Sequence, residues 1–244
     1  MKKSLITILL FSSIAAQAMP TVGSKVSGSI NETAAIGNIA IPIPSGEWTV
    51  VYEGKFQGPR TQRAGLDLTG YYGEASNKFE EIVLAQSNGS ALRSMIEIKF
   101  NLTNELKTYS DNLCTNNAAY YKDDYGTKLW KQKCLEVGSA NNVIYSGQDA
   151  KDKAIRAYIS ENKLATPRTF VAMNYAQYDQ DGSRVDIRLN ENPIVQGLDD
   201  QLDSSGLSQW SSEVISRYPQ KLSFMEKFKN FAKGYAQEVS NSFK

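Results

Sequence analysis

Residues 79–102 read FEEIVLAQSNGSALRSMIEIKFNL, two runs rich in β-branched and aromatic side chains on either side of an Asn-Gly pair. Such runs favour β-strands, and Asn88-Gly89 favours a tight hairpin turn because both residues tolerate positive φ. Along the second run, apolar and polar residues alternate, as in a strand with one face on a core and one face in solvent. The residues that we expect to face the core are Ile96, Ile98, Phe100 and Leu102.

A second hairpin is indicated around Asp181-Gly182. Residues 169–178 are strand-like, and after the turn Val185, Ile187 and Leu189 alternate with charged residues. This pattern again predicts two antiparallel strands joined by a short connection.

A helix is expected between the two hairpins, because residues 149–163 carry apolar side chains at helical spacing. Thr166-Pro167 should end it, since the residue before a proline disfavours the helical conformation. Upstream, the turn at residues 44–46 precedes residues 47–53, whose composition favours one more strand.

The C-terminal residues 208–244 are expected to be helical, with Pro219 dividing the segment. In the second half, apolar side chains recur every three or four residues and form one stripe. The stripe comprises Phe224, Phe228, Phe231, Tyr235 and Val239, and the lysines at 221, 227, 229 and 233 lie off it. Such a stripe docks a helix on a sheet, which we favour. The alternative is an anionic lipid surface, because residues 221–244 hold five lysines against two glutamates.

The order of elements predicts an α+β fold, in which an antiparallel sheet built from β-hairpins packs with one central helix and a C-terminal amphipathic helix. We expect a signal peptide over residues 1–18, a loosely held arm over 19–37 and the α+β domain over 38–195. A Gly-, Ser- and Asp-rich linker over 196–208 then leads to a helical segment, residues 209–244, that packs on the domain.

The N-terminus has the features of a secretory signal peptide. Lys2 and Lys3 precede a mostly apolar stretch, residues 5–16, and Ala16-Gln17-Ala18 fits a small-x-small cleavage site. No later run approaches the roughly 18 apolar residues of a membrane span. We therefore expect a soluble exported protein, periplasmic or secreted, with no transmembrane segment in the mature chain.

Cys114 and Cys134 are the two cysteines of the chain, 20 positions apart. In an oxidising compartment such a pair is expected to form a structural disulfide. The chain-entropy estimate for a loop of this length is a stabilisation of about 3 kcal/mol.

Composition excludes several function classes. The chain contains no histidine, which rules out Ser-His-Asp and Cys-His catalysis and every histidine-ligated metal or haem site. The 27 basic and 26 acidic residues nearly balance, so the basic footprint of a nucleic-acid-binding protein is missing. We expect no cofactor, no metal ion and no nucleic-acid partner.

Several features together resemble a family of uncharacterised exported proteins of proteobacteria, over most of residues 43–244. These are the turn before Glu47-Trp48-Thr49, the two cysteines, the helix leading to Ala165-Thr166-Pro167-Arg168-Thr169, the strand ending in Asn190-Glu191-Asn192-Pro193, Trp210, and the terminal amphipathic helix. The chain has Leu135 where the family pattern has an aromatic residue, and Phe228 and Phe231 where it has tryptophans. The family has no established activity, so the resemblance implies export and fold class and no catalytic residues.

Known catalytic motifs give weak matches. Ser160-Glu161-Asn162-Lys163 and Ser110-Asp111-Asn112 have the letters of a penicillin-recognising enzyme, but in reversed order, with Ser160 near the helix end and no Lys-Thr-Gly motif. A glycosidase needs only two carboxylates about 5–9 Å apart. The pairs that we consider are Glu80 with Glu97 and Asp186 with Glu191, although Glu97 lies on the strand face expected to be solvated.

The segment between the cysteines has the composition of a binding surface, in which aromatic rings supply contact area and amides supply hydrogen bonds. Its candidate binding residues are Tyr120, Tyr121, Tyr125 and Trp130. The alternative, which we favour for Trp130 and one or two of the tyrosines, is packing against the core.

The sequence thus favours an exported, non-catalytic protein that binds an unknown ligand or protein of the cell envelope. The alternatives are a carboxylate-dependent hydrolase acting on an envelope glycan, and an assembly protein that engages a partner or membrane surface through its C-terminal helix.

Overall fold

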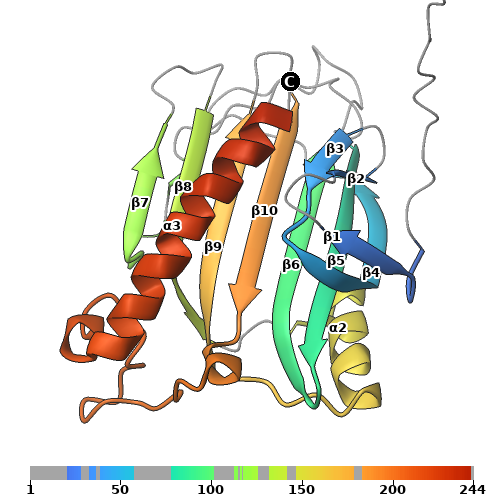
Figure 1. Cartoon of the computed structure of the whole chain (residues 1–244). Helices are drawn as coiled ribbons and strands as arrows, with labels where there is room; N and C mark the ends of the chain where they lie inside the picture. Colours follow the sequence, from blue (N-terminus) through green and yellow to red (C-terminus); the bar gives the residue numbers. More distant parts are fainter. Residues whose placement is uncertain are drawn as a thin grey trace, which may run out of the picture.

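Antiparallel pairing of neighbouring strands dominates the fold, which we describe from a computed structural model (Figure 1). The structure describes residues 21–28, 33–36, 39–57, 78–101, 113–114, 116, 118–125, 132–141, 147–178 and 183–242. Four features named above lie outside these residues: the expected signal peptide over 1–18, Leu102, Trp130 and the turn expected at Asp181-Gly182.

One eight-stranded sheet has the strand order β1-β4-β5-β6-β10-β9-β8-β7, and β2 and β3 form a separate two-stranded sheet. The strands are β1 (Lys25–Gly28), β2 (Thr33–Ile36), β3 (Ile39–Pro42), β4 (Gly46–Gln57), β5 (Lys78–Asn88), β6 (Ala91–Asn101), β7 (Tyr121–Asp124), β8 (Gln132–Asn141), β9 (Thr169–Tyr178) and β10 (Arg184–Glu191). The helices are α2 (Ala150–Glu161), α3 (Pro219–Ser242) and the 3-10 turns η1 (Pro193–Gln196) and η2 (Ile215–Arg217). The predicted α+β fold is confirmed.

Local sequence signals place the central elements. Asn88 and Ala91 pair across the first hairpin, and Gly89 in the turn has φ +59°. The predicted helix is α2, which begins after Asp149 because the side chain of Asp149 accepts a hydrogen bond of 2.7 Å from the backbone N–H of Asp152.

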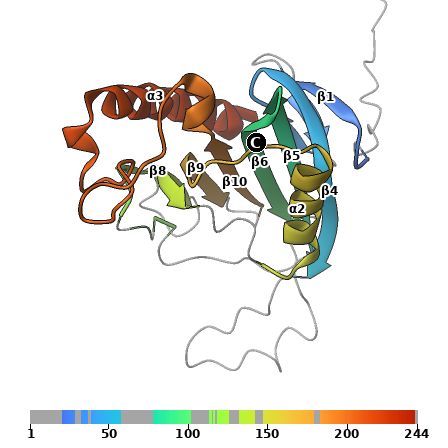
Figure 2. The same cartoon turned by 90° about the horizontal axis from the view of Figure 1, so that it is seen from below.

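The sheet has an apolar core on each face, and Figure 2 shows α2 and α3 on opposite sides of it. On the α3 side, β5 contributes Ile82 and Leu84 to the larger cluster. On the α2 side, Val83 and Ala85 pack in the smaller cluster with Ile155 of α2. Alternation along β5 therefore buries both of its faces.

α3 docks on the sheet, as the apolar stripe predicts, but the helix is rotated from the expected face. Phe228, Tyr235 and Val239 are buried, whereas Phe231 is 38% exposed. Met225 and Ala232, which are 0% exposed, also belong to the buried face. The hydroxyl of Tyr235 donates a hydrogen bond of 2.8 Å to the carbonyl of Pro42, so α3 also holds β3 in place.

The first half of the expected C-terminal helix is not α-helical. Residues 208–218 form turns and the short η2, and α3 begins at Pro219. A proline pre-sets helical φ at the first turn and needs no N–H partner there. The turns before Pro219 are held in place by Trp210. Its ring is fully buried, and its Nε1 donates a hydrogen bond of 3.1 Å to the carbonyl of Asp199.

The segment 196–208, expected to be a linker, is bound to the rest of the protein. Asp199 accepts a hydrogen bond of 2.5 Å from Lys221 of α3. Asp200 accepts one of 3.0 Å from the backbone N–H of Thr169 in β9. This segment therefore ties the start of α3 to the sheet.

The arm expected over residues 19–37 contains two strands. β1 pairs with β4 from Lys25 opposite Thr49 to Gly28 opposite Gly46, and β2 pairs with β3. The side chains of this Ser- and Gly-rich stretch alternate too weakly to predict a strand. Its backbone groups nevertheless form strands, because they hydrogen-bond to neighbouring strands.

Candidate functional site

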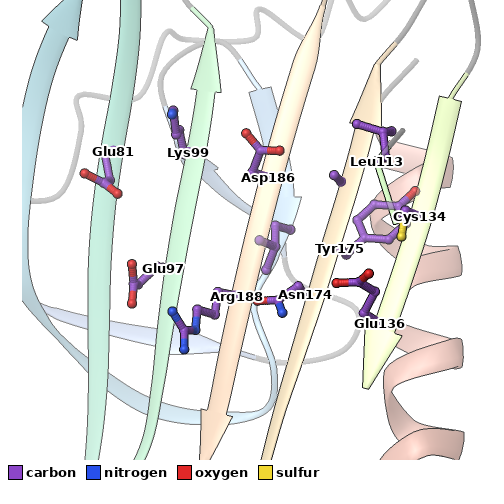
Figure 3. Close-up of a pocket in the computed structure, with 12 residues that line it drawn as sticks. Glu81, Glu97, Lys99, Leu113, Cys134, Glu136, Asn174, Tyr175, Asp186 and Arg188 are labelled. Atoms are coloured by element: carbon purple, nitrogen blue, oxygen red, sulfur yellow. The ribbon is translucent and has the colours of Figure 1, made fainter. Parts of the chain in front are cut away.

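A polar cavity of about 400 Å³ lies on the face of the sheet opposite α3 (Figure 3). Its walls come from β5, β6, β8, β9 and β10, and Leu113 lines one side. The polar side chains in the walls are Glu81, Glu97, Lys99, Glu136, Asn174, Asp186 and Arg188. Ligand sites in proteins typically measure about 300–1,000 Å³, so the cavity is large enough for a small molecule.

Strand register arranges these side chains in two rows that cross the sheet. In the first row, Glu97 of β6 is opposite Arg188 of β10. Arg188 is in turn opposite Asn174 of β9, which is opposite Glu136 of β8. Negative, positive, amide and negative groups therefore follow one another at the strand spacing of about 4.8 Å.

The second row lies one pleat further along the strands. Glu81 of β5 is opposite Lys99 of β6, and Lys99 is opposite Asp186 of β10. Opposite charges again alternate, an arrangement in which direct cross-strand neighbours attract.

Lys151, in the first turn of α2, pairs with two carboxylates of the cavity wall. Its Nζ lies 3.1 Å from Glu81 Oε1 and 2.8 Å from Glu97 Oε2. Burial by itself lowers the pKa of Lys151, but the carboxylates of Glu97 and then Glu81 outweigh it, so the pKa is raised above its usual value of 10.5. A charged ammonium thus links α2 to both rows.

Lys99 lines the cavity, and Arg184, at the start of β10, pairs with the wall residue Asp186. Arg184 Nε donates a hydrogen bond of 2.6 Å to Asp186 Oδ2, and its guanidinium lies over the rings of Tyr178 and Phe79. Lys99 Nζ lies 4.9 Å from the centre of the Phe79 ring. Burial and the nearby Arg184 lower the pKa of Lys99.

The disulfide fixes the β8 end of the cavity. Cys114 and Cys134 are bonded as predicted, with their Cα atoms 5.5 Å apart. The bond holds Asn116 near β8, where its backbone N–H donates a hydrogen bond of 2.8 Å to Glu136 Oε1. Glu136 lies close to both sulfurs. Because the sulfurs are bonded to each other and carry no thiolate, the three residues do not form a metal site.

Two polar groups on β10 lack partners in the part of the chain that the structure describes. Arg188 Nε is buried and makes no hydrogen bond. Asn190, the next residue on this face of β10, is fully buried, and neither its Nδ2 nor its Oδ1 has a partner. Buried polar groups are nearly always hydrogen-bonded, so these two residues are exceptional.

The carboxylate pairs considered from sequence are wrong. Glu80 shares a strand face with Ile82, on the α3 side, whereas Glu97 lies in the cavity on the other side of the sheet. Asp186 lines the cavity, and Glu191 lies an odd number of residues further along β10, so it faces away. The pair that the fold brings together is Glu81 with Glu97.

The predicted aromatic surface is divided by the fold. Tyr120 and Tyr121 are partly buried against the α3-side cluster. The hydroxyl of Tyr120 donates a hydrogen bond to Glu226 of α3, and that of Tyr121 donates one of 2.6 Å to Asp123. Lys229 and Lys233 of α3 lie over the ring of Tyr121. These two tyrosines therefore hold α3 on β7.

Tyr125 is the exposed member of the set, with 48% of its surface accessible. Partial burial of the other half of the side chain, followed by the hydrogen bond to the Asp123 carboxylate, raises the pKa of its hydroxyl. Trp130 lies outside the described residues, so a binding role for these aromatic residues stays a prediction.

The cavity residues were visible in the sequence only as the polar half of an alternating pattern. The polar residues of β6 and of β10 each look like a solvated face. Their meeting depends on β6 pairing with β10 rather than with the next strand along the chain, β7, and this non-local order has no local signal.

Comparison of the chain with protein-family models, with curated proteins and with solved structures gives no match. Among the described helices, none is both long and apolar enough to cross a membrane. The resemblance to exported proteobacterial proteins therefore stays a prediction.

Proposed function

We propose that this chain is an exported, non-catalytic binding protein of the cell envelope, and that it holds a small polar ligand in the cavity between α2 and the disulfide. The observation that carries the proposal is a cavity of about 400 Å³ whose walls include charged and amide side chains set in two register-matched rows. The disulfide and the N-terminal pattern of residues 1–18 support export.

The walls of the cavity are held rigidly, which favours binding. Lys151 fastens α2 to Glu81 and Glu97, and the disulfide fastens Cys114 to β8. Groups held in place before a ligand arrives lose little conformational freedom on binding.

Hydrolysis of an envelope glycan is the second candidate, because Glu81 and Glu97 now form a carboxylate pair. One ammonium, that of Lys151, lies between them and binds both. A general acid must instead hold a proton beside the bond to be cleaved. This ion-pair arrangement favours a structural role for both carboxylates.

An assembly role through the C-terminal helix has less support, since the apolar face of α3 is already buried against the sheet. Phe231 is the large apolar side chain that this helix exposes, and it stacks on Tyr235 of the same helix at a centroid distance of 6.0 Å.

Thermal unfolding with a panel of small envelope compounds tests the proposal. A ligand at 100 times its dissociation constant adds about 2.7 kcal/mol to stability, a rise in Tm of roughly 5–10 °C for a domain of this size. Asn174→Trp should abolish the shift, because Asn174 is an exposed cavity residue whose enlargement fills the site. Arg168→Trp, at an exposed position outside the cavity, should preserve it. A shift that survives Asn174→Trp would place the ligand elsewhere and refute the proposal.

A further inference from the structure

We propose that the ligand of this cavity carries a carboxylate group and that the guanidinium of Arg188 binds it. The inference rests on the proposed function, because it takes the cavity as the binding site. It adds the chemical class of the ligand and the residue that recognises it.

Arg188 differs from the other charged groups of the walls in having no partner among the described residues. Glu81 and Glu97 form ion pairs with Lys151, and Asp186 forms one with Arg184. Glu136 accepts a hydrogen bond from the backbone N–H of Asn116. Lys99 lies over the Phe79 ring. Within the described part of the chain, Arg188 makes no ion pair within 4 Å, and its Nε is buried without a hydrogen bond.

An arginine in this position is suited to a planar anion. Its guanidinium offers five N–H donors in a fixed fork, which matches the two oxygens of a carboxylate. Glu97, the neighbour of Arg188 in β6, directs Oε2 to Lys151 at 2.8 Å and makes no ion pair with Arg188. The charge of Arg188 is therefore available to an acceptor that enters the cavity.

The surroundings of Arg188 favour a monoanion over a phosphate group. Glu97, Asp186 and Glu136 line the same cavity, and their negative charge repels a doubly charged group more strongly than a carboxylate. The walls and the cations bound to them comprise four carboxylates and four basic groups, so the cavity has no excess positive charge.

Glu136 indicates what the rest of the ligand offers. It lies two strands from Arg188 in the first row, roughly 10 Å away at the usual strand spacing. Its Oε1 accepts a hydrogen bond from the backbone N–H of Asn116, whereas its Oε2 has no hydrogen-bond partner in the described chain. A ligand with a carboxylate at one end and an ammonium or hydroxyl donor at the other, such as a short peptide or a uronic-acid sugar, satisfies both residues.

Matched compounds test the inference by calorimetric titration of the purified, oxidised protein at constant ionic strength. The probes are alanyl-alanine against alanyl-alanine amide, and glucuronate against glucose, with inorganic phosphate as a competing anion. In at least one pair, we expect the carboxylate compound to bind about tenfold or more tightly than its uncharged counterpart, as for a charge-assisted bidentate hydrogen bond. The pair that shows this difference separates a peptide from a sugar acid.

Arg188→Met removes the charge and the donors while keeping a long apolar side chain, and it should erase the difference within the pair. The control Arg168→Met makes the same chemical change at an exposed position outside the cavity and should keep the difference. If Arg188→Met does not fold, Arg188→Lys serves instead. It keeps the charge but loses the planar fork, and should also weaken carboxylate binding.

Four results would overturn the inference. Equal affinity within both pairs, or a preference that persists in Arg188→Met, removes Arg188 as the carboxylate receptor while leaving cavity binding intact. If phosphate binds more tightly than either carboxylate probe, the ligand class is a phosphate and the carboxylate assignment is wrong. Binding by none of the probes at millimolar concentration overturns the carboxylate class, and a Tm shift with other compounds that Asn174→Trp abolishes would still uphold the proposed function.

Discussion

Asn190 near the end of β10 and Asn192 just after this strand are both buried, yet within the described chain only Asn192 has partners for its amide. Asn192 Nδ2 donates a hydrogen bond of 2.7 Å to the carbonyl of Leu92, and its Oδ1 accepts one of 3.0 Å from the N–H of Ile194. Asn190, beside Met95 in the register of the sheet, has neither. The same side chain therefore has opposite energetic roles at the two positions.

Asn190→Leu should stabilise the protein. Leucine has the same number and branching of side-chain heavy atoms, and removing unsatisfied polar atoms recovers about 1–2 kcal/mol. The midpoint of thermal unfolding should rise by roughly 2–8 °C. Asn192→Leu is the matched control, and it should destabilise because it removes two hydrogen bonds. A loss of stability in Asn190→Leu would mean that the Asn190 amide is satisfied.

The rotation of α3 predicts unequal effects for two phenylalanines. Phe228 is 6% exposed, so Phe228→Ala should cost about 3–5 kcal/mol of unfolding free energy. Phe231 is 38% exposed, so Phe231→Ala should cost less than about 1 kcal/mol. Urea unfolding monitored by circular dichroism measures both values. Equal losses would contradict the helix orientation described for α3.

Lys151→Met should destabilise the protein by about 2–4 kcal/mol, because it leaves two largely buried carboxylates without their ion partner. The exposed Lys153 of the same helix provides the control, and Lys153→Met should have little effect. Denaturant titration of the two variants gives the comparison.

The same variant has a defined pH dependence. Because the pKa of Lys151 is raised in the folded protein, its contribution is complete below the ordinary value of 10.5 and is lost as the pH rises through the folded value. The stability difference between wild type and Lys151→Met should therefore be constant from neutral pH to about pH 9.5 and shrink above about pH 10.5. A difference that already shrinks near pH 8 would argue against the Lys151 ion pairs.

The hydroxyl of Tyr120 should lose its proton at a higher pH than an ordinary tyrosine. Burial, and then the hydrogen bond to Glu226, raise the pKa of its hydroxyl to about 12 from the usual 10.0. Tyr120 therefore stabilises the fold fully below pH 10 and progressively less as the pH rises toward 12. Phenolate absorbance should show one tyrosine shifting to lower pH in Glu226→Gln and none in Glu213→Gln, a change at an exposed site. Unchanged titration in Glu226→Gln would remove Glu226 as the partner.

Reduction of the disulfide should affect both stability and binding. Loss of the Cys114–Cys134 bond should cost about 3 kcal/mol by the loop-entropy estimate. Asn116 would also lose its fixed position beside Glu136, so the Tm shift produced by a cavity ligand should be smaller in the Cys114→Ser, Cys134→Ser protein. A full ligand shift in the doubly substituted protein would show that the cavity does not need the bond.

The elements predicted well from sequence are those with local signals. The range 169–178 is β9 as expected, the helix over 149–163 appears as α2, and the hairpin turn at Asn88-Gly89 is confirmed. Turn chemistry, strand composition and helical spacing act within a few residues, so each pattern is complete in its own segment.

What the sequence could not supply depends on contacts between distant segments. The facing of Glu97 and Arg188 follows from the pairing of β6 with β10, which are separated by more than 80 residues. The exposure of Phe231 depends on which side of α3 meets the sheet. The bonds of Asp199 and Asp200 make an ordered connection from a Gly- and Ser-rich stretch that local composition predicts to be a linker.

Ile82 and Val83 are consecutive in β5 yet belong to two apolar clusters that the sheet keeps apart. Side chains of one cluster do not reach the other, so repacking on one side cannot fill a hole made on the opposite side. The losses of unfolding free energy caused by Ile82→Ala and Ile155→Ala should therefore add when the two substitutions are combined. Two substitutions within one cluster should instead show coupling. The backbone of β5 and β6 is common to both layers, and its amide hydrogens should be among the last to exchange with heavy water.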